Sequence, residues 1–169
     1  MHRQRARMSI PRAVLAALVV ACCALGATPA AAEEPSPFEQ LAGRWIGEGR
    51  LGIRNGNTEA VKCRVTYILS GGPDQLKQTI RCASQGGSVE VQSTVSHASG
   101  ALAGTWKELI RDLGGELSGR VTANGFHVAI NGADLSASMH IIVRDSRQII
   151  EIQFHNSTLI GLTLVLAKG

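Results

Sequence analysis

The sequence predicts an all-β protein, a single antiparallel up-and-down meander of about ten strands closed as a barrel. Two observations support this fold class. After Pro37, apolar and polar residues alternate almost to the end of the chain, which is typical of strands with one buried face. Short clusters of Gly, Asn, Asp and Ser interrupt the alternation about every ten residues, and these residues favour tight turns.

The strand boundaries follow from these interruptions. In chain order the predicted strands span 43–54, 58–69, 75–83, 88–96, 101–110, 116–123, 126–131, 135–144, 147–154 and 158–167. Pairs such as Asn55-Gly56 and Asn124-Gly125 are hairpin turn sequences. Upstream of the first strand, we expect Ser36 to Ala42 to form a short helical turn that plugs one end of the barrel.

The first 32 residues have the features of a cleaved signal peptide. Four arginines and no acids precede an apolar run over 13–27, and small residues lead up to Ala32. We expect cleavage after Ala32, which leaves an N-terminal arm over 33–42 and a barrel domain over 43–169. The apolar run is short for a membrane span, so none is expected in the mature chain. The alternative is a lipoprotein signal in which Cys22 is acylated and anchors the protein.

Charge and cysteine content indicate the cellular compartment and the classes of partner to expect. The chain has 17 basic and 13 acidic residues, and four of the basic ones lie in the predicted leader, so the mature chain is formally neutral. A nucleic-acid partner is therefore not expected. We expect a periplasmic or secreted bacterial protein. Cys63 and Cys82 are the two cysteines outside the leader, and an oxidising compartment favours a disulfide between them.

Turn positions also predict how the strands pair. Centring the second hairpin on Gly72-Pro73 places Cys63 opposite Cys82, within reach of a disulfide. The first hairpin, centred on Gly56, places Trp45 opposite Tyr67. Together these registers give one continuous apolar face, as a buried sheet face requires.

One short motif resembles a known group of proteins. Gly43-Arg44-Trp45 opens the first predicted strand, and a Gly-x-Trp at this place resembles that of the calycins, small antiparallel barrels that include the lipocalins. The stretch over 115–139 resembles uncharacterised exported proteins of soil bacteria. The calycin resemblance implies that Trp45 packs across the closed end of the barrel and that the interior binds a small apolar molecule. In a lipocalin, an arginine of the last strand packs on this tryptophan, whereas the last strand predicted here contains no arginine.

The inward face contains the candidate ligand-binding residues. A possible cavity would be lined by Trp45, Tyr67, Trp106, Glu108, Phe126 and Phe154. A ten-strand barrel is wide enough for a cavity, and the alternative is an interior filled by its own side chains. Other inward polar residues are predicted to be Gln78, Ser93, Gln148 and Thr158. Glu108 is the one inward carboxylate, and it either contacts a ligand or reaches water at the rim.

Three other kinds of site are considered and not expected. Gly47-x-Gly49-x-x-Gly52 matches the dinucleotide fingerprint, but a strand rather than a helix follows it, so no cofactor is expected. The side chains of His127, His140 and Glu151 face outward and could hold a metal, although a solvated surface pair of histidines is the more common arrangement. No serine, histidine and acid are brought together, so we expect neither catalytic residues nor an enzyme.

The sequence therefore favours a non-enzymatic envelope protein that binds a small apolar or amphipathic ligand in its barrel. The alternative is an interaction protein that acts on another envelope protein through its rim loops and arm. Secreted bacterial metalloprotease inhibitors have a similar general form, with an eight-strand barrel, one disulfide, an early Gly-x-Trp and an N-terminal arm. Glu33 to Gln40 would be that arm.

Overall fold

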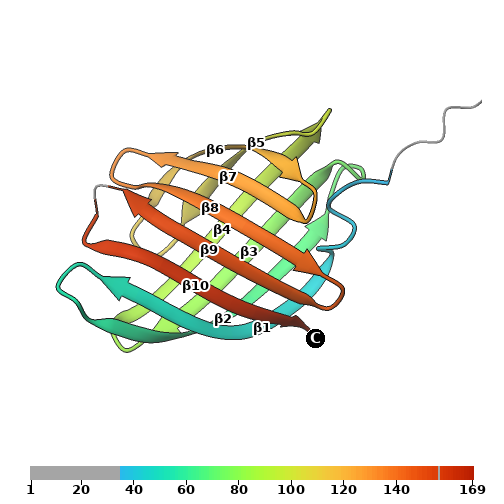
Figure 1. Ribbon diagram of the computed structural model, residues 1–169. Helices are drawn as coiled ribbons and strands as arrows, with labels where there is room; N and C mark the ends of the chain where they lie inside the picture. The colour runs from blue at the N-terminus through green and yellow to red at the C-terminus, as the bar shows by residue number, and fades with distance from the viewer. Residues whose placement is uncertain (1–34, 156) are drawn as a thin grey trace, which may run out of the picture. The chain divides into compact units, whose positions relative to one another are not determined.

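The computed structural model describes residues 35–155 and 157–169, and it confirms the fold class: ten antiparallel strands form a closed barrel (Figure 1). The strands are β1 (Gly43–Ile53), β2 (Thr58–Leu69), β3 (Gln75–Ser84), β4 (Gly87–Ala98), β5 (Ala101–Glu108), β6 (Leu113–Thr122), β7 (Gly125–Gly132), β8 (Ser136–Arg144), β9 (Arg147–His155) and β10 (Leu159–Lys168). The predicted leader, its cleavage after Ala32 and the alternative anchor at Cys22 lie outside the described residues.

Each strand pairs with the next along the chain, and β1 pairs with β10 to close the barrel. Two glycines of the Gly47-x-Gly49-x-x-Gly52 motif allow this closure. A Cβ added at Gly47 would lie 2.0 Å from the carbonyl oxygen of Val165, and one at Gly49 would lie 1.8 Å from that of Thr163. These glycines therefore allow the backbones of β1 and β10 to approach closely. Strand β2 follows them rather than the helix that a dinucleotide fingerprint requires.

The predicted pairing is confirmed for β2 with β3 and wrong for β1 with β2. Cys63 faces Cys82, as expected. Trp45 faces Val65 rather than Tyr67, a slip of two residues. The first turn is centred one residue earlier than Gly56, and a slip of two leaves every side chain on its predicted face.

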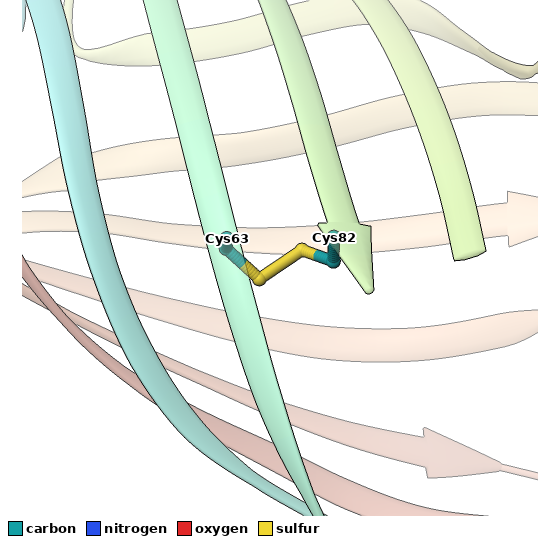
Figure 2. The surroundings of a disulfide bond; sticks show 2 residues. All are labelled: Cys63 and Cys82. Carbon is teal, nitrogen blue, oxygen red and sulfur yellow. A yellow bond between two sulfur atoms is a disulfide. The ribbon is translucent and has the colours of Figure 1, made fainter. Parts of the chain in front are cut away.

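The Cys63–Cys82 disulfide joins neighbouring strands β2 and β3 inside the barrel (Figure 2). The two Cα atoms are 4.1 Å apart, and both side chains are buried. The disulfide therefore lies in the core and fixes the register of these two strands.

The arm closes one end of the barrel. We call this end, formed by the turns after β2, β4, β6 and β8, the plugged end. Residues 36–42 form successive hydrogen-bonded turns in place of a regular helix, and the bond from the Ala42 N–H to the Phe38 carbonyl oxygen is the single helical turn expected here. The Ser36 hydroxyl donates to the carbonyl oxygen of Pro73, and Phe38 stacks on Phe126 with ring centroids 5.9 Å apart. Phe38 and Leu41 are each only 2% exposed, so the arm is an integral part of the core.

Trp45 packs beside this plug. Its side chain is fully buried, and its indole Nε1 donates to the carbonyl oxygen of Leu41 at 2.7 Å. The ammonium of Lys168, at the end of β10, lies 5.4 Å from the centre of the Trp45 ring. A final-strand cation thus packs on the early tryptophan, although it is a lysine rather than an arginine.

Candidate functional site

At the opposite end of the barrel, none of the described residues forms such a cover. We call this end, formed by the turns after β1, β3, β5, β7 and β9, the open end. Twelve apolar side chains are only partly buried against the core, and nine of them lie in the half of the barrel toward the open end. The nine are Leu51, Ile80, Val89, Val91, Leu113, Ile130, Leu135, Ile152 and Leu162. Inward apolar side chains that retain exposure form a surface that an apolar molecule can contact.

A hollow of about 260 Å³ lies at the rim of the open end. Its walls include Trp106, Leu113 and Leu135, together with residues of the turns after β5 and β7. The Trp106 indole is fixed there because its Nε1 donates to the carbonyl oxygen of Asn131 at 3.2 Å. A Cβ added at Gly132 would lie 2.8 Å from the Trp106 ring, so this glycine makes room for the indole. The hollow therefore has one rigid aromatic wall.

Glu108 is buried, and its carboxylate caps the turn after β5. It accepts backbone N–H groups of Ile110 at 3.1 Å, Arg111 at 2.7 Å and Glu90 at 3.3 Å. Burial by itself raises the pKa of Glu108, but these three hydrogen bonds and the Arg111 guanidinium outweigh it and leave the pKa lowered. Glu108 is therefore an ionised structural group, and its oxygens are occupied by backbone donors.

A polar cluster lies inside the barrel between the two ends. Gln148 Nε2 donates to the Tyr67 hydroxyl at 3.0 Å. This hydrogen bond crosses the inside of the barrel and joins β9 to β2, which β10 and β1 separate in the sheet. Burial raises the pKa of Tyr67, so its phenol stays protonated. The Ser93 hydroxyl donates to Gln78 Oε1 at 3.3 Å. Gln78, Ser93 and Gln148 were predicted to face inward, whereas Thr158, also predicted inward, is exposed.

The six predicted cavity-lining residues do not gather in one place. Trp45, Tyr67 and Phe126 belong to the filled interior near the plugged end. Trp106, Glu108 and the half-buried Phe154 lie toward the open end. Sequence reasoning missed that Leu113 and Leu135 contribute to the rim, because the hollow depends on how two turns approach each other.

A second and larger hollow, of about 720 Å³, lies on the outer face of β1 to β4. Charged side chains such as Lys62, Arg64 and Glu48 line it, and Arg81 there bonds Glu90 at 2.8 Å. Its walls combine apolar side chains such as Ile46 and Ile110 with charged side chains of both signs, and it is widely open to solvent on the outside of the sheet.

The outward histidines form a stacked pair. His127 faces His140 directly rather than diagonally, with ring centroids 4.2 Å apart, and Glu151 faces His140 as expected. Burial lowers the pKa of His127, and the neighbouring His140 and Arg120 lower it further. Within 35–155 and 157–169, no three His, Cys, Asp or Glu side chains are placed to hold a metal ion. None of the described residues belongs to a helix with the length and apolarity needed to cross a membrane.

Comparison with known proteins finds solved structures of similar fold. No protein-family model matches the sequence, and the search of curated proteins found no match. Among solved structures, Rv2717c from M. tuberculosis is similar with a TM-score of 0.67 and 13% identity, over 78% of this chain and 94% of that one. The S-type phycobiliprotein lyase CPES from Guillardia theta has a TM-score of 0.56 and 9% identity, over 78% and 90% of the two chains. At these identities the likeness concerns the fold alone, a closed antiparallel barrel.

Proposed function

We propose that this protein is a non-enzymatic binding protein that takes a small apolar or amphipathic molecule through the open end of its barrel. The observation that carries the proposal is the uneven burial of the inward face. Apolar side chains are sealed beneath the arm at one end, whereas at the other end they remain partly exposed around the Trp106 hollow. Contact with an apolar ligand would remove that surface from water, at about 25 cal/mol for each Å².

Two further features support this proposal. The rim is held by the Trp106–Asn131 hydrogen bond and by the Glu108 cap, so the binding surface is formed before a ligand arrives. One of the solved structures with this barrel bears the name of a lyase acting on phycobiliproteins, which is an example of such a barrel working on another molecule.

The proposed location is the periplasm or the exterior of a bacterial cell. The buried Cys63–Cys82 disulfide supports this location, because disulfides persist in oxidising compartments. A protease inhibitor acting through its arm is less well supported. Phe38 is buried between Phe126 and His97, so this part of the arm would first have to leave the core.

Binding of N-phenyl-1-naphthylamine, a neutral dye that fluoresces in apolar surroundings, tests the proposal. The wild-type barrel is expected to bind the dye. Leu162→Gln, on the inward face of β10, should weaken binding about tenfold, because a polar group then interrupts the apolar wall.

Val165→Gln is the matched control, because Val165 lies on the same strand but is 49% exposed on the outer face. This variant should bind the dye as the wild type does. Absence of dye binding to the folded wild type, or equal weakening by both variants, would contradict a site inside the open end.

A further inference from the structure

The interior contains one buried amide that the protein does not satisfy. Gln78 and Ser93 face each other across β3 and β4, and they are 7% and 8% exposed. Gln78 Oε1 accepts the Ser93 hydroxyl, whereas Gln78 Nε2 is the one buried side-chain polar atom without a hydrogen-bond partner in the described part of the chain. A buried donor of this kind is unfavourable unless an acceptor meets it, so its position in the barrel is informative.

The amide lies one inward pair deeper in the barrel than partly exposed apolar side chains of the open half. The next inward pair toward the open end is Ile80 and Val91, and both side chains are partly exposed. On the other side, Tyr67 lies directly opposite Gln78 in the β2–β3 register, close enough for the Gln78 side chain to lower the Tyr67 pKa, and its hydroxyl is hydrogen-bonded to Gln148. Gln78 Nε2 therefore lies at the inner limit of an apolar wall that begins at the open end, which is the arrangement expected for an amphipathic ligand that enters with its polar group first.

The charges of the interior restrict that polar group further. Glu108 is the one charged side chain among the buried residues that the structure describes, and it is negative. The polar groups near Gln78 are the neutral side chains of Ser93, Tyr67 and Gln148. A carboxylate or phosphate placed beside them would be a buried charge without a counter-ion, which is strongly disfavoured.

We propose that the barrel selects an apolar ligand with a neutral hydrogen-bond acceptor at its inner end, such as a ketone, ester or amide carbonyl. Gln78 Nε2 donates to this oxygen, and the apolar chain extends along Ile80 and Val91 toward the rim. The inference rests on the proposed function and adds the chemical class of the ligand.

Displacement of bound N-phenyl-1-naphthylamine by three compounds of equal chain length tests this specificity. The compounds are 2-decanone, 1-decene and decanoic acid at neutral pH. The wild type should bind the ketone about tenfold more tightly than the alkene, the difference expected for one hydrogen bond in a site shielded from water. It should bind the acid more weakly than the ketone.

Gln78→Leu is the decisive variant. It keeps the approximate size of the side chain and removes the unpaired donor, but it also removes the acceptor of the Ser93 hydroxyl, so its stability should be close to that of the wild type. Its affinity for the alkene should be retained and its preference for the ketone lost. Gln92→Leu, on the exposed outer face of β4, is the matched control and should behave as the wild type. In the wild type, the amide proton resonances of Gln78 should shift on addition of 2-decanone and stay in place with 1-decene, which is a readout independent of the variant.

The outcomes separate the two proposals. If the wild type binds the dye but shows no ketone preference, or if Gln78→Leu keeps that preference, the assignment of Gln78 is overturned and the binding barrel stands. If the amide resonances do not respond to the ketone, the assignment is likewise overturned. If the dye does not bind the folded wild type at all, the proposed function itself fails.

Discussion

The two ends of the barrel achieve stability by different means. At the plugged end, packing dominates: the arm adds Phe38 and Leu41 to the core, and Trp45 and Val65 beside them are fully buried. Toward the open end the apolar side chains are less covered, and specific bonds hold the structure. These are the Cys63–Cys82 disulfide, the Trp106–Asn131 hydrogen bond and the Glu108 cap.

The difference explains how the open end can present apolar surface without collapsing. A rim that is held by a covalent bond and by hydrogen bonds to the backbone does not need close packing of its inward side chains. The plugged end has no such freedom, because its stability depends on filling space. Three measurements test this contrast, in order of decreasing expected effect.

The largest effect is expected from a matched pair of phenylalanine truncations. Phe38→Ala should lower the free energy of unfolding by about 3–5 kcal/mol, because Phe38 is buried in the plug. Phe154→Ala, at the open end, should cost about 1 kcal/mol, since its ring is already partly exposed. Urea unfolding followed by tryptophan fluorescence measures both values. Equal losses would show that the two ends are packed alike.

The next effect concerns the disulfide. Replacing Cys63 and Cys82 together by alanine should lower stability by roughly 3 kcal/mol, the value expected for opening a loop of 19 residues. Thermal unfolding in oxidising buffer measures the loss, and the wild type with reductant serves as its control. An unchanged melting temperature would mean that packing alone holds β2 and β3 together.

A smaller effect is expected from Glu108 and depends on pH. The pKa of this carboxyl is lowered in the fold from its ordinary value of 4.5. Its contribution is therefore complete above that ordinary value and is lost as the pH falls through the lowered folded-state pKa. Glu108→Gln should cost about 2 kcal/mol at neutral pH and reduce the loss of stability in acid.

Urea titrations between neutral pH and about pH 3 measure this dependence. Glu116→Gln, at an exposed position on β6, is the control and should leave the acid dependence as it is in the wild type. A Glu108→Gln variant with the acid profile of the wild type would show that the backbone bonds to this carboxylate do not stabilise the rim.

Sequence reasoning succeeded where the information is local and failed where distant segments meet. The β2–β3 register was predictable because Gly72-Pro73 marks the turn and the two cysteines check it. The β1–β2 register was wrong by two residues because side-chain alternation has a period of two, and such a slip leaves each face unchanged. The stacked His127–His140 pair was misplaced for the same reason.

The candidate site was predictable in part. The inward position of Glu108 and Gln78 follows from alternation along their strands. The role of Glu108 does not, because it depends on backbone N–H groups that the turn after β5 brings to the carboxylate. Similarly, the local sequence does not indicate that Gln148 forms a hydrogen bond with Tyr67, 81 residues away. Nor does it indicate that Gln78 Nε2 has no hydrogen-bond partner among the described residues.

The sequence by itself determined the fold class, the face on which most strand residues lie and the disulfide, because these depend on alternation, turn residues and one hairpin. Only the tertiary structure decided which end of the barrel is filled. Alternation gives both ends the same apolar inner face, and the difference arises when the arm covers one of them with Phe38 and Leu41. The proposed binding surface is the inward face that this arm leaves uncovered.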